Sequence, residues 1–259
     1  MIEEKDNIRD LGILMDNKLN FKAQRNKVIS KANQKAGWVL RTFKSRQVDF
    51  MRILFRSLIQ PHLDYCSIIW APVSNKGELL AMEGPLRSYT KKAYDTAHLN
   101  YWERLSVFRL SSIQRRVQRY KILYIWKMRN GLVPDCGLVP ASNNGTRSME
   151  TYQTRPIRAK HEGIKTKLKD SLFCHGVSLY NCLPLQLREF DGELSEFKLH
   201  LDRFLKKLPD QPEIPGLIPD AVDIYGKPSN CIIDWVRIIN PPFKLKTNDD
   251  MFYNFDDIT

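Results

Sequence analysis

The chain has 259 residues, of which 42% are hydrophobic and 27% charged, enough for one sizeable core or two small ones. Its formal net charge of +12 and pI near 9.5 favour a polyanionic partner, most simply RNA or DNA. No apolar run reaches membrane-spanning length and the N-terminus lacks the pattern of a signal peptide, so we expect an intracellular protein, cytoplasmic or nuclear, with no membrane partner.

The N-terminal segment IRDLGILMD, residues 8–16, predicts a short strand that ends at Asp16. A lone strand is not stable by itself, so this segment needs a partner.

The stretch from Lys18 to Phe43 predicts an amphipathic helix, because its apolar residues recur every three or four positions. Lys27, Lys31 and Lys35 lie four residues apart on another face of that helix. Like charges at this spacing destabilise a helix slightly, so a ligand or an acidic neighbour would be favourable there. The alternative interpretation is a solvated lysine face.

A second helix is predicted through FMRILFRSLIQ, with Asp49 as its N-cap and a kink or restart at Pro61. The following segment, HLDYCSIIW, is almost wholly apolar and is expected in the core. We therefore interpret His62 as a hydrogen-bonded structural histidine.

A third helix is predicted over residues 75–83, with an interruption at Gly84-Pro85 and a resumption in LRSYTKKAY. Basic residues alternate with tyrosines in the resumed part. Such interleaving suits a surface that follows a nucleic-acid backbone and stacks bases, but it also suits an amphipathic helix with half-buried tyrosines. The basic residues are Arg87, Lys91 and Lys92, and the tyrosines are Tyr89 and Tyr94.

A fourth helix is predicted to begin at a cap on Ser111 or Ser112 and to end at Asn130-Gly131. It carries six basic residues and no acidic one, whereas a merely solvated helix usually mixes signs. Here nucleic-acid binding and a solvated face are equally good interpretations. The six basic residues are Arg115, Arg116, Arg119, Lys121, Lys127 and Arg129.

The positive charge is concentrated in the first helical half. Residues 17–130 carry 23 Lys and Arg against 6 Asp and Glu, a net +17. Residues 1–16 carry a net −3 and residues 131–259 a net −2.

The second half begins with residues 132–160, which are rich in Pro, Gly, Asn, Ser and Thr and predict a linker or long ordered loop. Helical patterns follow over 163–190, up to Leu183-Pro184, and over 193–209. From Asp210 prolines and acids dominate, and most of this tail is predicted to be disordered, with 231–239 as a docking segment.

Two features of the sequence, an acidic pair near its end and its cysteines, resemble chemical sites but are not interpreted as such. FYNFDD, residues 252–257, resembles the aromatic-x-Asp-Asp turn of polymerases, but it has one residue too many and no third carboxylate placed to complete a two-metal site. We therefore interpret Asp256 and Asp257 as solvated tail residues. Five cysteines without regular spacing predict reduced thiols and not a zinc site.

Several co-linear segments carry a resemblance to a family. DLGILMDNKLNF, LFRSLIQPHLDYCSIIWAP, YWERLSVFRLSSIQRRVQRYKILYIWKMRNGLVP, SLFCHGVSLYNCLPLQLREF and EFKLHLDRFLKKLPDQPEIPG occur in this order. Together they resemble the region that follows the polymerase core in reverse transcriptases of jockey-like LINE (non-long-terminal-repeat) retrotransposons. The resemblance spans residues 8–216, with a fainter echo at 229–236.

The resemblance implies an RNA-directed DNA polymerase family whose catalytic aspartates lie in a palm upstream of the element matched here by Leu11-Gly12. None of those aspartates is carried over, so we expect no catalytic residue, no metal site, no cofactor and no enzyme activity in this chain.

The implied fold is mainly α, a helical thumb-like bundle with a short N-terminal strand, a second small helical unit and a flexible C-terminal tail. The expected divisions are 1–16 as the remnant of a palm-end strand, 17–131 as the basic thumb-like domain, 132–160 as linker, 161–209 as the C-terminal helical unit and 210–259 as tail.

The function expected from these features is electrostatic binding of the backbone of an RNA or DNA template–primer by a catalytically incomplete fragment. A protein-interaction scaffold and a non-functional remnant are the alternatives, and self-association is expected through surface that a missing palm would expose. The predicted nucleic-acid-binding residues are Lys27, Lys31, Lys35, Arg87, Lys91, Lys92, Arg115, Arg116 and Arg119.

Overall fold

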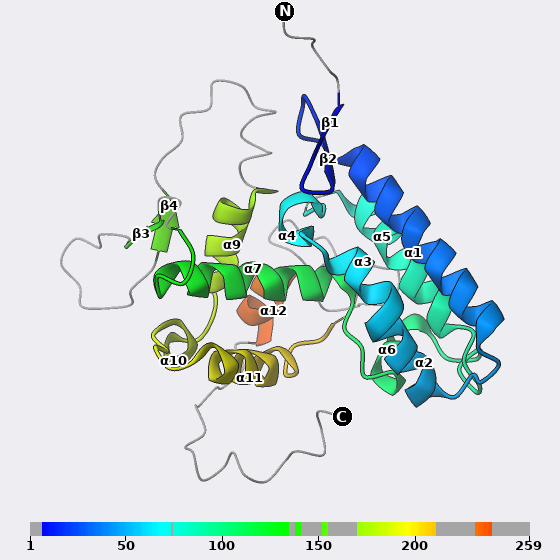
Figure 1. The fold of residues 1–259 in the computed structure, drawn as a ribbon. Helices are drawn as coiled ribbons and strands as arrows, with labels where there is room; N and C mark the ends of the chain where they lie inside the picture. The colour runs from blue at the N-terminus through cyan, green and yellow to red at the C-terminus, as the bar shows by residue number, and fades with distance from the viewer. Residues whose placement is uncertain are drawn as a thin grey trace, which may run out of the picture.

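The structure is a computed structural model that describes residues 7–73, 75–134, 138–140, 152–154, 170–210 and 231–239. It is mainly α-helical, as the sequence predicts, and it has a short two-stranded sheet at the N-terminus (Figure 1). Its first helices are α1 (Lys22–Thr42), α2 (Val48–Leu54), the π-helical turn η1 (Phe55–Ile59), α3 (Gln60–Asp64), α4 (Ser67–Trp70), α5 (Lys76–Thr90), α6 (Tyr101–Val107) and α7 (Ile113–Arg129). The later elements are β3 (Leu138–Pro140), β4 (Tyr152–Thr154), α9 (Leu172–Asn181), α10 (Leu185–Arg188), α11 (Leu194–Leu205) and α12 (Ile232–Ile239).

The N-terminal segment is a hairpin, and the prediction of a single strand was wrong. Strands β1 (Asn7–Asp10) and β2 (Ile13–Asp16) pair in antiparallel register, with Asp10 opposite Ile13. The turn residues Leu11 and Gly12 have φ of 44° and 86°, the positive values that the tightest two-residue hairpin turns require. The segment thus supplies its own pairing partner.

Helix α1 confirms the predicted amphipathic helix. Val28, Ala32, Ala36 and Val39 are buried along one side. Beyond its end, the Arg46 guanidinium donates to the carbonyl of Leu40 at 2.5 Å, and this donor satisfies a carbonyl that the last turn leaves without a helical partner.

The region from α2 to α3 differs from the prediction at its start and agrees at Pro61. Gln47 is the N-cap of α2, and Asp49 lies within the first turn, where it forms an ion pair with Arg52 at 2.9 Å. Pro61 lies in the first turn of α3, so the helix restarts there, after the wider turn of η1. A proline fits this position because its missing N–H has no helical acceptor in a first turn.

Helix α5 continues through Pro85, so the predicted interruption was wrong. The residue before a proline normally avoids helical angles because its Cβ crowds the proline ring. Gly84 has no Cβ, which removes that clash. The asparagine that precedes the helix, Asn75, caps it by accepting from the N–H of Glu78 at 3.1 Å.

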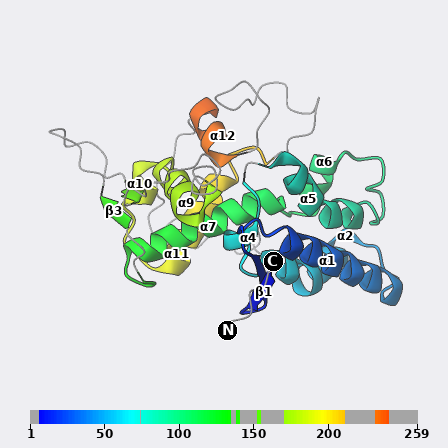
Figure 2. The ribbon, with the colours of Figure 1, turned by 90° about the horizontal axis from the view of Figure 1, so that it is seen from above.

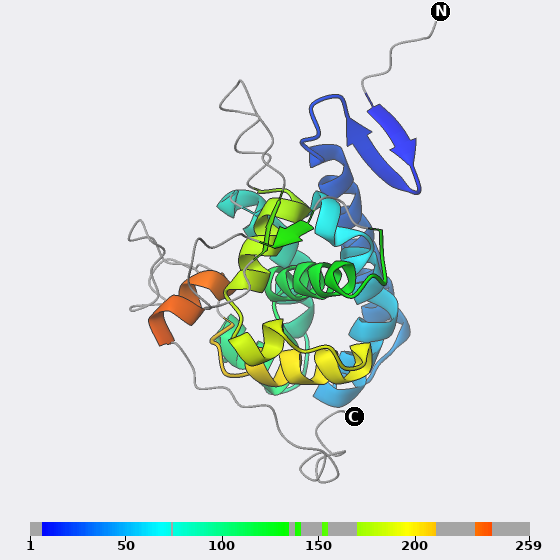
Figure 3. The same ribbon diagram turned by 90° about the vertical axis from the view of Figure 1, so that its left-hand side faces the viewer.

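Helix α7 begins and ends as predicted. The Ser112 hydroxyl accepts from the N–H of Arg115 at 3.0 Å, Asn130 is the C-cap, and Gly131 follows with φ 67°. However, α7 is buried on most of its surface, and Figure 3, which looks nearly along its axis, shows helices of both halves around it.

The two halves of the protein pack on this one helix. The N-terminal part of α7, with Ile113 and Val117, belongs to a core shared with α1 to α6. The C-terminal part, with Ile122 and Trp126, belongs to a second core shared with α9, α10, α11 and α12. Figure 2 shows the two groups of helices at opposite ends of α7.

The second core contains two segments that the sequence singled out. Helix α11 is the predicted amphipathic helix, with Phe197, Leu201 and Phe204 fully buried. Helix α12 lies within the predicted docking segment and docks on the protein itself: Ile232 is fully buried, and its N–H donates to the Gln118 side chain of α7 at 3.1 Å.

Strands β3 and β4 pair in antiparallel register within the predicted linker, with Leu138 opposite Thr154. The remainder of 135–169, residues 211–230 and residues 240–259, including Asp256 and Asp257, lie outside the described residues. Within the described part, no helix is long and apolar enough to cross a bilayer.

Candidate nucleic-acid interface

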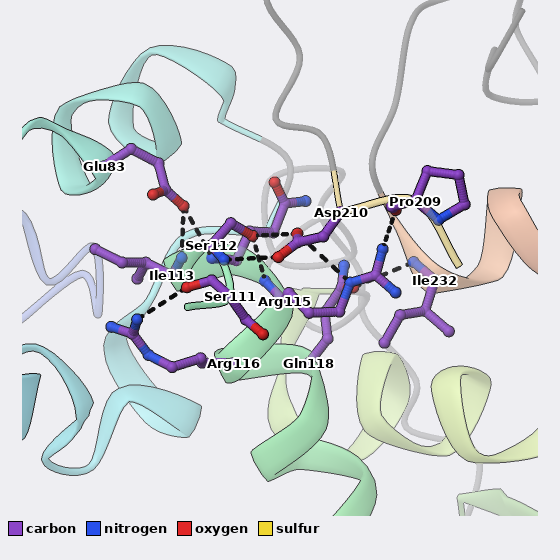
Figure 4. Close-up of polar contacts among 11 residues, drawn as sticks. Glu83, Ser111, Ser112, Ile113, Arg115, Arg116, Gln118, Pro209, Asp210 and Ile232 are labelled. Atoms are coloured by element: carbon purple, nitrogen blue, oxygen red, sulfur yellow. Dashed lines mark hydrogen bonds and ion pairs between the residues drawn. The ribbon is translucent and has the colours of Figure 1, made fainter. Parts of the chain in front are cut away.

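The arginines of α7 that were predicted to bind phosphate are held in internal ion pairs. Arg115 is 3% exposed, and its guanidinium donates to the Pro209 carbonyl and lies 3.6 Å from the Asp210 carboxylate (Figure 4). Burial lowers the pKa of Arg115 and the Asp210 charge opposes that shift, so the guanidinium needs this carboxylate to remain buried as a cation.

Arg116 and Arg119 are paired in the same way. Arg116 is 7% exposed, and its Nε donates to Asp64 Oδ1 of α3 at 3.1 Å. Arg119 donates from Nε and Nη2 to the two oxygens of Asp202 of α11, at 2.5 and 2.7 Å. The prediction that Arg115, Arg116 and Arg119 form a phosphate-binding surface is therefore corrected, because their carboxylate partners come from distant parts of the chain.

Lys121 extends this internal row of cations. It is 1% exposed, with Nζ 3.3 Å from both the Asp170 carbonyl oxygen and His175 Nδ1. Burial lowers the pKa of Lys121 to about 8, and burial together with the Lys121 charge lowers the pKa of His175 to about 3. Both shifts follow from the cost of a charge in a water-poor interior.

Two carboxylates meet the N-terminal end of α7. Glu83 accepts from the N–H of Ile113 at 2.7 Å (Figure 4). It also accepts from the Tyr101 hydroxyl at 2.7 Å, and burial raises its pKa. Asp210 accepts from the N–H and the hydroxyl of Ser112 at 2.7 and 2.6 Å. Acceptors at this end satisfy N–H groups that the first turn leaves unpaired and complement the helix dipole.

The carboxylates of the basic half are thus mostly engaged with arginines and backbone N–H groups. Asp64 pairs with Arg116, Glu78 pairs with Arg25 at 2.6 Å, and Asp49 pairs with Arg52. Each of these three carboxylates is thus paired with an arginine and not with a lysine of α1.

An exposed basic surface lies on α1. We call Lys27, Lys31 and Lys35 the lysine stripe. All three side chains are exposed, as the sequence predicts for a face separate from the apolar stripe. Among the described residues, no carboxylate lies within ion-pair distance of any of them. Within the described part of the chain, the stripe is therefore a row of positive charge without ion-pair partners.

His62 of α3 lies close to this stripe. Its pKa is lowered by burial and then by the positive charges of Lys31 and Lys35. The side chain is half-buried and makes no hydrogen bond to any described residue, so the interpretation of His62 as a hydrogen-bonded core histidine was wrong.

Trp38 lies beside the lysine stripe on the same face of α1 and was not among the predicted site residues. It lies three residues after Lys35 and seven after Lys31, and the Lys35 ammonium is 5.5 Å from the centroid of its ring. The same helical spacing that defined the lysine face would have placed Trp38 on it.

The second predicted basic group, on and after α5, is only partly exposed. Arg87 lies over the Tyr101 ring at 5.0 Å and is half-buried, whereas Lys91 and Lys92 are exposed. The N–H of Tyr94 donates to the Arg46 carbonyl at 3.0 Å, which brings this segment beside the loop that follows α1. Exposed Arg41 lies in the last turn of α1, and exposed Lys44 lies in that loop. We call Arg41, Lys44, Lys91 and Lys92 the basic end.

The two tyrosines of this segment, Tyr89 and Tyr94, differ in exposure. Tyr89 is 1% exposed and donates to the Met51 carbonyl at 3.0 Å, as an ordinary core tyrosine does. Tyr94 is 59% exposed. Only Tyr94 is thus accessible to a ligand.

A metal site does not emerge from the described residues, in which no three His, Cys, Asp or Glu side chains come together to hold an ion. Cys66, Cys174, Cys182 and Cys231 are not in disulfide bonds, and Cys136 lies outside the described residues. Burial raises the pKa of Cys182 to about 12, so this thiol is not activated as a nucleophile.

Comparison with known proteins finds a likeness to an uncharacterized protein. A protein of Caenorhabditis elegans described as uncharacterized is 28% identical over 129 residues, which cover 49% of this chain and 63% of that protein. No family model matches the chain, and no solved structure matches it.

Proposed function

We propose that this protein binds the phosphate backbone of nucleic acid through the lysine stripe and the basic end. The observation that carries the proposal is that internal arginines and exposed lysines differ in their surroundings. Four arginines are paired with carboxylates between the helices, namely Arg25, Arg115, Arg116 and Arg119. The stripe lysines Lys27, Lys31 and Lys35 instead form an exposed row with no carboxylate partner among the described residues.

This arrangement suits phosphate contacts that do not read sequence. Exposed ammonium groups neutralise phosphates and release condensed counterions, so affinity depends strongly on salt and little on base order. If the six exposed lysines of the two patches each neutralise one phosphate, the log–log salt slope on duplex is roughly −5.

The resemblance to the region after the polymerase core of LINE-type reverse transcriptases supports the same role. In that interpretation the helices around α1 and α5 correspond to a thumb that grips a template–primer. The proposal differs from the expectation based on sequence in its residues, since Arg115, Arg116 and Arg119 now stabilise the fold.

The test is the salt dependence of binding by the Lys31→Gln/Lys35→Gln variant. Removing two phosphate contacts is expected to make the log–log slope on duplex shallower by about two, with equal effect on unrelated sequences. Fluorescence anisotropy with labelled duplexes over a salt series measures this slope.

The matched control is Lys198→Gln/Lys206→Gln, which removes the same charge from exposed positions on and just after α11. We expect this control to keep the wild-type slope. If both variants change the slope equally, binding follows net charge alone and the lysine stripe is not the interface.

A second candidate function, protein association, is favoured by the exposed apolar surface of the N-terminal hairpin. Ile8 and Leu11 are 58% and 81% exposed, and the nearby Tyr65 is 55% exposed, with its hydroxyl donating to the Leu11 carbonyl at 2.9 Å. The predicted docking segment, residues 231–239, instead contributes α12 to the protein's own core, as residues 193–209 contribute α11. Salt-insensitive self-association, measured by sedimentation and abolished by Leu11→Ser, would support this second function.

A further inference from the structure

We propose that the lysine stripe together with Trp38 is a site for single-stranded nucleic acid, in which the lysines hold phosphates and an unpaired base stacks on the indole. This inference rests on the proposed function, because it needs the stripe to bind phosphate. It adds the class of ligand and the residue that selects it.

Trp38 differs from the other tryptophans in its exposure. It is 44% exposed, whereas Trp70, Trp126 and Trp235 are 1%, 2% and 7% exposed and lie in the two cores. Trp102 is half-buried against the first core. The exposed apolar surface of this indole is unfavourable in water, and a base stacked on the ring would bury part of that surface.

The position of Trp38 relative to the lysines follows from helix geometry. Lys27, Lys31 and Lys35 are four residues apart, so their successive Cα atoms are offset by about 6 Å along the axis, and Trp38 comes one turn after Lys35. An extended strand laid along this row therefore reaches the indole at the end of its phosphate contacts.

Local contacts hold the indole in place. Lys35 Nζ is 5.5 Å from the ring centroid, and the Phe43 ring packs edge-to-face against it, with centroids 6.2 Å apart and planes at 89°. A ring fixed in this way loses little further freedom when a base stacks on it, which favours binding.

The same geometry discriminates between single and double strands. In a duplex the bases are already stacked on one another inside the helix, so an indole on a protein surface gains no base contact. In a single strand every base exposes a π face, and stacking on an aromatic side chain is sequence-tolerant. The lysines contribute to binding of either form, whereas Trp38 contributes to the single strand alone.

The experiment compares Trp38→Ala and Trp38→Phe with the wild-type protein, using a labelled oligothymidylate and a labelled duplex of equal length. Trp38→Ala is expected to weaken binding of the oligothymidylate by on the order of tenfold, the size of one base–aromatic stack, and to leave duplex binding and its salt slope unchanged. Trp38→Phe keeps an aromatic ring and is expected to retain most of the single-strand affinity.

A second readout uses the intrinsic fluorescence of the wild-type protein. Because Trp38 is the accessible indole among the tryptophans of the described residues, stacking is expected to quench the fraction of emission that Trp38→Phe removes. Circular dichroism of each variant shows that it is folded, and the quenching measurement on the wild-type protein does not depend on any variant.

The outcomes separate the two proposals. Equal losses on both ligands, an undiminished affinity of Trp38→Ala for the oligothymidylate, or absence of quenching overturns the role of Trp38. If duplex binding still responds to Lys31→Gln/Lys35→Gln, the proposed function survives that result. If neither ligand responds to the lysine substitutions, the proposed function itself fails.

Discussion

Arg119 and Asp202 join α7 to α11 through two parallel hydrogen bonds, Nε to Oδ1 at 2.5 Å and Nη2 to Oδ2 at 2.7 Å. Burial opposes the charge on Arg119, but the hydrogen bond and charge of Asp202 outweigh it and raise the pKa of Arg119. Arg119, whose sequence context indicates nucleic-acid binding, thus connects α7 to a helix of the C-terminal half.

Breaking this pair is expected to destabilise the protein without a specific effect on phosphate binding. Arg119→Ala and Asp202→Ala should each lower the free energy of unfolding by about 1–2 kcal/mol, since the pair is bidentate but partly exposed. Urea denaturation of the single and double variants measures the coupling, with Lys206→Ala as an exposed control. If the two losses simply add in the double variant, the side chains are not coupled.

Arg115 is expected to be more sensitive than Arg119 because it is almost fully buried against Asp210 and the Pro209 carbonyl. Arg115→Ala should cost about 2–4 kcal/mol, since it leaves a carboxylate at the α7 N-terminus without its cation. Arg115→Met fills the same space without a charge and should recover part of this loss. Variants that keep wild-type stability but bind nucleic acid weakly would instead restore Arg115 to the interface.

Lys121 should make stability depend on pH in a direction set by its burial. Its pKa falls from 10.5 to about 8 in the folded protein, so the folded state binds fewer protons than the unfolded state between these values. The resulting penalty on folding is absent above pH 10.5, grows as pH falls to about 8, and stays in full below that.

Lys121→Met is therefore expected to be more stable than the wild-type protein at pH 7, by on the order of 2 kcal/mol. The gain should shrink as pH rises from 8 to 10. Denaturant midpoints across this range give the difference, and a difference that does not vary with pH would contradict the assignment.

Alanine substitutions at Gly84 and Gly37 test whether the absence of a Cβ at Gly84 allows Pro85 inside α5. Alanine at Gly37, inside α1, meets only the flexible end of Arg41 at 3.4 Å and should stabilise the helix by about 0.5–1 kcal/mol. Alanine at Gly84 enters open space, but its Cβ crowds the ring of Pro85 in the helical conformation. Thermal unfolding should show a gain for Gly37→Ala and a loss for Gly84→Ala, and equal gains would show that Pro85 imposes no restriction.

His62 should couple nucleic-acid binding to pH if the lysine stripe binds phosphate. Its pKa is lowered by burial and by Lys31 and Lys35, and an anion bound to those lysines would raise it again. Protons are then taken up on binding, so affinity should rise as pH falls from 7.5 to 5.5, on the order of three- to tenfold. His62→Gln should remove this rise, while His98→Gln, an exposed control outside the stripe, should keep it.

Local signals in the sequence predicted most of the helices correctly. The spacing of Val28, Ala32 and Val39 defined α1, and Ser112 and Gly131 defined the ends of α7. Local prediction failed where a neighbouring residue altered the expected conformation. Gly84 removed the clash by which Pro85 would interrupt α5. The Leu11-Gly12 turn divided the expected single strand into two paired strands.

The sequence by itself determined a mainly helical chain with its positive charge in the first half, because periodicity, capping residues and composition act over a few neighbouring positions. Only the tertiary structure decided which of those charges face solvent, because Asp64, Asp202 and Asp210 lie from 52 to 95 positions away from the α7 arginines they meet. An ion pair depends on proximity in space, and packing both halves on α7 brought these carboxylates to the arginines while leaving the lysines of α1 in water.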